Sequence, residues 1–92
     1  MQFQLTVLCL NVRRFTLGKR DFYSAMIARE PMTPAERSTN RGYLVQQVTT
    51  AAEVFEQTAG LDRPETLSFI CTLVEVPGGA VQPHLLSVSR SG

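Results

Sequence analysis

Five short runs with strand-like patterns dominate this sequence, and only one stretch has a helical period. The clearest run, residues 2–10, alternates polar and apolar side chains up to Val7 and is then continuously apolar. A period of two is typical of a half-buried strand, because successive side chains point to opposite faces. A chain of 92 residues has room for one core. These features predict a single, mostly β domain over residues 1–92.

A basic hairpin is predicted after the first strand. Gly18, within the proposed tip at residues 16–19, can supply the positive φ of a tight turn, and residues 21–28 then form the second strand. A second hairpin is predicted around Gly78 and Gly79 for the same reason. The remaining runs, rich in β-branched, aromatic and aliphatic residues, are residues 43–48, 66–76 and 84–90.

The helical pattern lies between the third and fourth strand-like runs. Thr50 followed three positions later by Glu53 matches a capping box, and Gly60 stands where a helix can end in the left-handed conformation. Apolar residues between them, including Phe55, recur at helical spacing. We therefore expect one short helix over residues 51–59, held by packing onto the sheet.

The resulting element order is strand, strand, strand, helix, strand, strand. Residues 30–42, which contain two prolines and no apolar period, are predicted to form a surface loop between the second and third strands. Five strands with one helix between the third and the fourth match an OB-like barrel, a fold whose strand faces and loops often bind oligonucleotides or oligosaccharides. A plain α+β meander fits the same order.

The net charge of +1 is low for a protein that binds a polyanion. The distribution of charge is uneven, however. Four of the nine basic residues fall within eight positions, and the acid that adjoins them is Asp21. Acidic residues gather instead around the predicted helix and after it, which predicts one positive and one negative face. The basic group is Arg13, Arg14, Lys19 and Arg20; the acidic group is Glu53, Glu56, Asp62 and Glu65.

The sequence offers little for catalysis or for metal binding. Cys9 and Cys71 both sit in apolar runs without histidine or cysteine at metal-ligand spacing, which favours buried thiols. His84, the sole histidine, has no acidic residue or cysteine close in sequence. A catalytic pair of His84 with Cys9 or Cys71, brought together in space, is disfavoured because both thiols sit among apolar residues. Gly78 and Gly79 precede a strand and are not followed by the Lys-Ser/Thr of a phosphate-binding loop. We expect no enzymatic activity, no cofactor and no metal.

The first ten residues contain the one stretch that resembles a signal peptide. Its basic residues follow the apolar run instead of preceding it, and the run is too short to cross a bilayer. We therefore expect a cytoplasmic protein that makes no membrane contact.

Cations and aromatic rings are interleaved in and after the predicted hairpin, the combination that binds single-stranded nucleic acid by phosphate contacts and base stacking. Strand alternation places Phe22 and Tyr23 on opposite faces. We expect Tyr23 to point outward, because its hydroxyl would otherwise need a buried partner, and Phe22 to enter the core. Phe15, placed in the loop, is the alternative stacking ring. The candidate binding residues are Arg13, Arg14, Phe15, Lys19, Arg20, Tyr23, Arg41 and Tyr43.

A structural interpretation of these residues stands beside the functional one. Lys and Arg at a hairpin often provide only solubility and protection of a strand edge. Tyr43 fits a core position as well as a stacking surface.

The segment Thr16-Leu17-Gly18-Lys19-Arg20-Asp21-Phe22-Tyr23-Ser24 resembles the basic Gly-Lys turn and aromatic-Ser strand of the single-stranded DNA-binding proteins of filamentous bacteriophages. The final strand, glycine turn and Leu-Leu-Ser-Val strand are similar in layout to the C-terminal hairpin of that family. The resemblance implies an OB-like barrel, a symmetric homodimer and cooperative coating of phage DNA in the host cytoplasm. It also implies that Lys19 and Arg20 contact phosphates and that Tyr23 stacks on bases.

Two functions follow as hypotheses. The first is non-enzymatic, largely sequence-independent binding of single-stranded nucleic acid, DNA more than RNA, in phage or plasmid replication. The alternative is a protein-interaction or regulatory module that uses a strand edge or the helix face.

Overall fold

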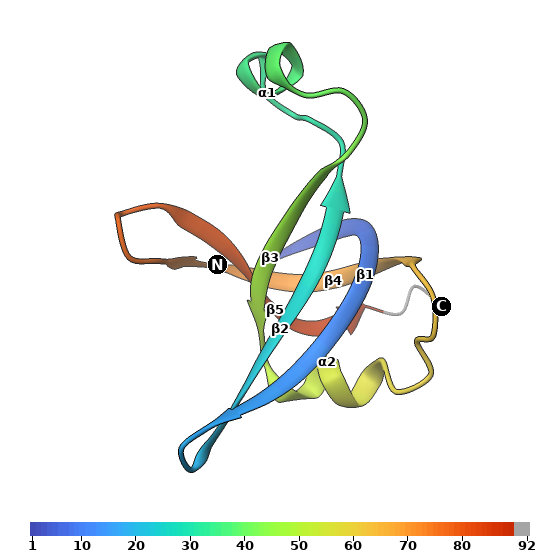
Figure 1. Ribbon diagram of the computed structural model, residues 1–92, viewed down its shortest axis with the longest axis vertical. Helices are drawn as coiled ribbons and strands as arrows, with labels where there is room; N and C mark the ends of the chain where they lie inside the picture. Colours follow the sequence, from blue (N-terminus) through green and yellow to red (C-terminus); the bar gives the residue numbers. More distant parts are fainter. Residues whose placement is uncertain (90–92) are drawn as a thin grey trace.

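The computed structural model describes residues 1–89, which form a closed five-stranded barrel with two short helices (Figure 1). The predicted mostly β barrel, with a helix between the third and fourth strands, is therefore confirmed. Arg90, with which the last strand was predicted to end, lies outside the described residues. In chain order the elements are β1 (Phe3–Leu17), β2 (Arg20–Arg29), α1 (Pro34–Thr39), β3 (Leu44–Thr50), α2 (Ala52–Gln57), β4 (Glu65–Glu75) and β5 (Val81–Ser89).

The long strand β1 serves two neighbours and so bends the sheet into a barrel. Its first half pairs with β4 from Phe3 to Cys9, and its second half pairs with β2 from Leu8 to Leu17. The register with β2 shifts between Cys9 and Asn11, where Leu10 is the extra residue of a bulge. A bulge increases local twist and bends the strand. It lies where β1 changes partner, as the curvature of a closed barrel requires.

The barrel closes along a short parallel seam between β3 and β5, next to each other in the strand order β1-β2-β3-β5-β4. Two residue pairs form this seam, Thr49 with His84 and Thr50 with Leu85. The chain then leaves β3, and the Ala51 backbone N–H donates to the Leu85 carbonyl at 2.8 Å. Beyond the seam, the side-chain oxygen Oε1 of Gln57 in α2 accepts a hydrogen bond from the Val88 N–H at 2.6 Å. A helix side chain thus takes the place of a strand partner at the edge of β5.

The core fills the barrel with small and medium side chains around one aromatic ring. Phe69, Ile27 and Leu85 are fully buried, and Val54 reaches them from α2 with an exposed fraction of 0%. The helix covers one end of the barrel (Figure 1). Its six residues are too few to be stable alone, so burial of Val54 must hold it in place.

The start and end of α2 differ from the prediction. Thr50 belongs to β3 and is buried, and its hydroxyl donates to the Ala51 carbonyl instead of capping the helix. The N-cap is Ala51, without a side-chain hydrogen bond, and the C-cap is Thr58 instead of a left-handed Gly60. The predicted capping box at Thr50 was therefore wrong, because Thr50 is the last residue of β3 and pairs with β5 in the seam.

The loop predicted over residues 30–42 contains helix α1, which begins with a complete capping box. The Thr33 hydroxyl accepts from the Glu36 N–H at 3.1 Å, and the Glu36 carboxylate accepts from the Thr33 N–H at 3.4 Å. The same carboxylate accepts hydrogen bonds from both terminal nitrogens of the Arg29 guanidinium group, at 3.1 and 3.0 Å. Hydrogen bonds from Arg29 and from the Met32 N–H lower the pKa of Glu36 to about 2.

Within residues 1–89, neither helix is long and apolar enough to cross a membrane.

Shortening the buried side chain of α2 should loosen the end of the barrel that it covers. We expect Val54→Ala to lower the free energy of unfolding by about 2 kcal/mol, since it removes two buried carbon atoms and leaves a cavity. Urea denaturation followed by circular dichroism measures this change. Glu56→Gln, at an exposed position of the same helix, should stay within about 0.5 kcal/mol of the parent. Equal effects of the two substitutions would contradict the packing described.

Candidate functional site

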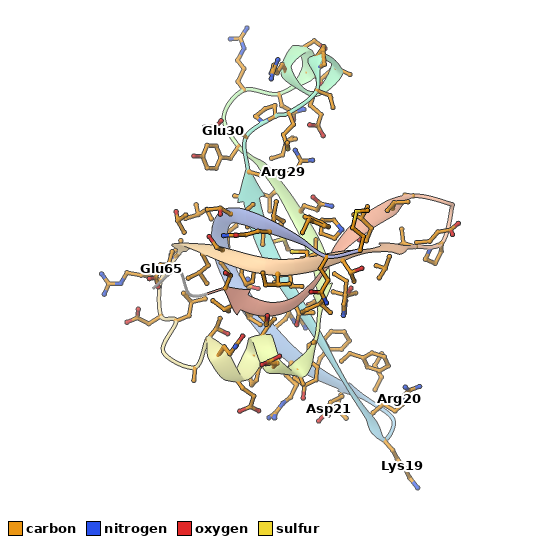
Figure 2. The ribbon with its side chains drawn as sticks, turned by 180° about the vertical axis from the view of Figure 1, so that it is seen from behind. Lys19, Arg20, Asp21, Arg29, Glu30 and Glu65 are labelled. Atoms are coloured by element: carbon orange, nitrogen blue, oxygen red, sulfur yellow. The ribbon has the colours of Figure 1, made fainter. Side chains whose placement is uncertain are left out.

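The paired ends of β1 and β2 project from the barrel as a two-stranded ribbon, which we name the basic ribbon (residues 13–24). It extends about 16 Å past Val12, since five residue pairs each add about 3.3 Å. Gly18, with φ of 64°, and Lys19 form a two-residue loop that closes the Leu17–Arg20 pair. Lys19 and Arg20 extend from this tip into solvent (Figure 2). The predicted glycine-containing basic hairpin is therefore confirmed.

The register assigns each side chain of the basic ribbon to one of two faces. Tyr23 lies two residues before the buried Ala25, so it belongs to the face that continues the core. Phe15 and Phe22 are direct partners on the opposite, outer face, and their rings stack with centroids 5.7 Å apart and an interplanar angle of 21°. Phe22 is 39% exposed. The outer face therefore carries a pair of stacked rings.

The prediction that Tyr23 points outward while Phe22 enters the core was wrong. Tyr23 is half-buried and packs against Phe55 of α2, with ring centroids 5.8 Å apart. A half-buried tyrosine keeps its polar tip in water while its ring is packed, so its hydroxyl does not require an outward position. Phe22, absent from the predicted site residues, is the more exposed ring. Phe15, predicted in the loop, lies within β1.

The guanidinium groups of the basic ribbon lie over aromatic rings, and no carboxylate of residues 1–89 pairs with them. Arg13 lies 5.2 Å from the Phe15 ring centroid, Arg20 6.0 Å from that of Phe22, and Arg14 5.4 Å from that of Phe55. The ion pairs found within residues 1–89 are Arg29–Glu36 and Arg63–Asp62, both outside the ribbon. Asp21, the nearby acid, accepts instead from the Thr16 hydroxyl at 2.7 Å. The ribbon cations thus keep their charge available to a ligand.

Arg41 and Tyr43, two further predicted site residues, are not brought to the basic ribbon. They immediately precede β3, whose residue Leu44 pairs with Arg29 at the far end of β2. Arg29 lies nine residue steps from Arg20 along β2, or about 30 Å of extended chain, and Figure 2 shows these two residues far apart. Tyr43 is 56% exposed, so the core interpretation of this ring was wrong.

Polar side chains continue the outer face of the ribbon onto the barrel. Ser24 is 4% exposed, and its hydroxyl oxygen has no hydrogen-bond partner among the described residues. Leaving a buried hydroxyl unpaired costs about 1–3 kcal/mol. Beside it, the Thr49 hydroxyl and His84 Nδ1 are hydrogen-bonded at 2.7 Å. Sequence reasoning missed Ser24 and Thr49, because only the register identifies them as neighbours.

The cysteine and histidine side chains lie on different faces of the sheet. Cys9 and Cys71 are 0% exposed in the core, which confirms the prediction of buried thiols. Burial raises the pKa of the Cys71 thiol to about 11 and is the main cause of a raised pKa at Cys9. His84 pairs with Thr72 of β4 and bonds to Thr49 on the outer face. The cysteine–histidine pair considered from the sequence is therefore not assembled.

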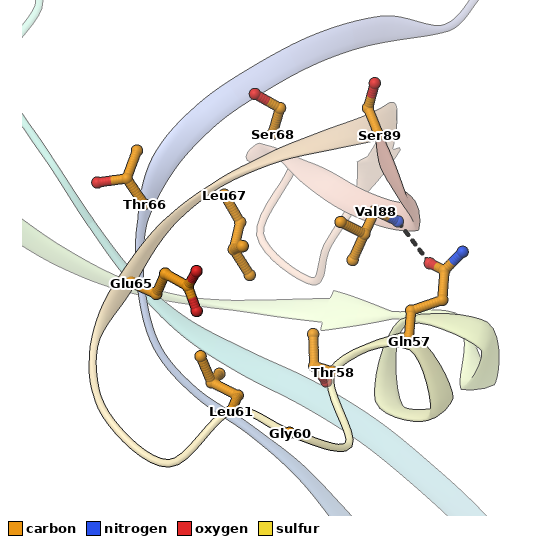
Figure 3. A pocket seen from close by; sticks show the side chains of 10 residues that line it. All are labelled: Gln57, Thr58, Gly60, Leu61, Glu65, Thr66, Leu67, Ser68, Val88 and Ser89. Carbon is orange, nitrogen blue, oxygen red and sulfur yellow. Dashed lines mark hydrogen bonds between the residues drawn. The ribbon is translucent and has the colours of Figure 1, made fainter. Parts of the chain in front are cut away.

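An open cavity of about 610 Å³ lies between the end of α2 and strands β4 and β5 (Figure 3). Its walls combine apolar side chains such as Leu61, Leu67 and Val88 with several hydroxyls, and the charged residue lining it is Glu65. A carboxylate disfavours a phosphate-bearing ligand there. A polyanion is accommodated better by the basic ribbon than by this cavity.

No protein-family model, curated protein or solved structure matches the chain. The resemblance to filamentous-phage DNA-binding proteins therefore stays a prediction, and the functional argument depends on the geometry of the chain itself.

The buried thiols should be inert in the folded protein. At pH 8 we expect a disulfide reagent that releases a coloured thiolate to react slowly with the native chain, because the thiolate is the nucleophile and both sulfurs are inaccessible. In denaturant, both cysteines should react at once. A native thiol that reacts as fast as the denatured ones would contradict the burial of Cys9 and Cys71.

Proposed function

We propose that this chain binds single-stranded nucleic acid through the outer face and tip of the basic ribbon, without catalysing a reaction. The observation that carries the proposal is the stacked pair Phe15–Phe22 beside cations that no carboxylate neutralises within residues 1–89. Cations that follow a phosphate backbone, together with rings on which bases stack, are what sequence-tolerant binding of single strands requires. DNA is preferred to RNA in this proposal because of the resemblance to the phage proteins.

The proposed binding exchanges cation–ring contacts for phosphate contacts. Arg13 and Arg20 lie over the same rings on which bases would stack. A base that stacks on Phe22 must therefore displace the Arg20 guanidinium, which is then free to pair with the adjacent phosphate. A guanidinium–ring contact at an exposed site is worth about 0.5–1 kcal/mol, less than the about 1–3 kcal/mol of a base–ring stack. The exchange is favourable.

The proposal also fits the general use of OB-like barrels, in which the loop between the first two strands borders the ligand face. Here that loop is Gly18–Lys19, and the strands leading to it carry the stacked rings. Of the four acidic residues singled out from the sequence, Glu53 and Glu56 belong to α2, Asp62 to the connector after it and Glu65 to β4, so none of the four stands on the strands of the ribbon. We infer that a polyanion approaches from the outer side of the ribbon.

Removing the two tip cations should weaken binding in a salt-dependent manner. For Lys19→Ala/Arg20→Ala, we expect the affinity for a short fluorescent oligo-dT to fall by about tenfold at low salt. The slope of log K against log salt should become shallower by about 1.4, because each phosphate contact on a single strand contributes about 0.7. Fluorescence anisotropy at several salt concentrations measures both quantities, and an RNA of equal length tests the preference for DNA.

The matched control removes the same charge elsewhere. Arg37 in α1 and Arg63 in the connector before β4 are both exposed, so Arg37→Ala/Arg63→Ala lowers the net charge equally without touching the ribbon. This variant should retain the parental slope. If the two double variants lose affinity equally, only net charge matters and the proposed site is wrong.

Removing the exposed ring should weaken binding without changing its salt dependence. We expect Phe22→Leu to lower the affinity for oligo-dT by at least fivefold, since a base stack is worth about 1–3 kcal/mol, while the salt slope stays the same. Tyr43→Leu is the control, because it removes a second exposed ring at the other end of β2. Loss of affinity in Tyr43→Leu but not in Phe22→Leu would mean that bases stack near Tyr43 and not on the ribbon.

One observation favours the alternative function, protein binding. Leu73 and Val81 are each 58% exposed and share one face of the β4–β5 hairpin, where they are diagonal neighbours. Exposed apolar side chains on a projecting hairpin suit contact with a second copy of this chain, as the expected homodimer would need. Under this hypothesis, Leu73→Ser/Val81→Ser abolishes a dimer seen by sedimentation and leaves oligonucleotide affinity unchanged.

A further inference from the structure

A row of polar side chains crosses the outer face of the barrel at one level. Arg13 of β1 pairs with Ser24 of β2, Ser24 pairs with Thr49 of β3, and Thr49 pairs with His84 of β5. Residues directly opposite each other on neighbouring strands share a face. The row therefore spans four adjacent strands, or about 14 Å at the usual strand spacing. We name its three uncharged members, Ser24, Thr49 and His84 on β2, β3 and β5, the polar row.

Ser24 is the unusual member of the row. Its side chain is more than nine-tenths buried, and its hydroxyl has no partner within the described residues. An unpaired buried hydroxyl destabilises the fold, so its presence calls for a partner that the folded chain does not itself supply.

The other two members are held ready for hydrogen bonding. The Thr49 hydroxyl and His84 Nδ1 are 2.7 Å apart, which fixes the orientation of the ring. When the hydroxyl donates to Nδ1, the neutral imidazole carries its proton on Nε2 and can donate from there. Thr49 is exposed, and its direct neighbour on β2 is Ser24.

The polar row begins where the stacked rings end. Phe22 and Ser24 are two residues apart on the same face of β2, a distance of about 7 Å along the strand. A base stacked on Phe22 would thus place its hydrogen-bonding edge toward Ser24. Arg13, the direct neighbour of Ser24 on β1, now lies over Phe15. Its movement toward a phosphate would open the hydroxyl from that side.

We propose that the polar row hydrogen-bonds the edge of the nucleobase stacked on Phe22, which adds a base preference to otherwise sequence-tolerant binding. This inference rests on the proposed function. It assigns phosphate contact to the ribbon cations and base contact to Ser24, Thr49 and His84. The two sets of residues therefore differ in how their removal affects salt dependence.

The test measures the affinities of Ser24→Ala and Thr49→Val for oligo-dT, oligo-dC and oligo-dA of equal length at several salt concentrations. The parent should prefer one homopolymer by at least fivefold. Each substitution should reduce that preference to less than twofold without changing the salt slope. Ser24→Ala should be at least as stable as the parent to urea, because it removes an unpaired buried hydroxyl. Ser68→Ala, which removes an outward hydroxyl of β4 bonded to Thr6, should keep the parental preference.

The outcomes separate this inference from the proposed function. A parent protein that binds no oligonucleotide overturns both. A parent that binds all three homopolymers equally, with Ser24→Ala unchanged, overturns the base contact and leaves the ribbon proposal standing. A shallower salt slope in Ser24→Ala or Thr49→Val would mean that the row contacts phosphate, and the inference would be wrong.

Discussion

Closure of the barrel depends on a contact of two residue pairs, where β3 meets β5 in parallel. Without it the five strands would form an open, twisted sheet with two unpaired edges, a form prone to pairing with other chains. Two hydrogen bonds extend the contact beyond the strands themselves: Ala51 N–H to the Leu85 carbonyl, and Val88 N–H to the Gln57 side chain. The segment that leaves β3 and becomes α2 therefore completes the closure. This explains why a six-residue helix with one fully buried side chain occupies a fixed place.

The helix that completes the closure also contacts the basic ribbon. Its inner face is supported by α2, since Tyr23 packs on Phe55 and Arg14 lies over the same ring. Its outer face is left to the Phe15–Phe22 pair and to cations that rest on rings. A phosphate approaching these arginines competes with a weak cation–ring contact and not with a strong ion pair. The low net charge of the chain is thus compatible with a locally strong positive potential.

The sequence predicted most of the fold but only part of the site, for reasons that particular residues make clear. The five strands with a helix between the third and the fourth, the glycine turns and the buried cysteines follow from local patterns, and the structure confirms them; helix α1, in the segment predicted as a loop, was missed. Thr33-x-x-Glu36 and Thr50-x-x-Glu53 are the same motif, and only tertiary pairing of Thr50 with β5 decides which one caps a helix. The apolar run in β2 does not reveal which face is buried, so the orientations predicted for the Phe22 and Tyr23 side chains were the reverse of those observed. The distance of Arg41 and Tyr43 from the ribbon, and the proximity of Ser24 to Thr49, depend on strand register, which no local pattern encodes.

The two-residue loop at the tip has a consequence for how such a protein can diversify. Because Gly18 and Lys19 join the strands directly, ribbon length is set only by the number of paired residues below them. Inserting one residue into each strand lengthens the ribbon by about 3.3 Å but reverses which side chains beyond the insertion face outward. Inserting two residues into each strand lengthens the ribbon by twice that distance and keeps every side chain on its original face. Ribbon length can therefore vary in steps of two pairs while the barrel interior stays untouched, so footprint size and folding stability can evolve separately.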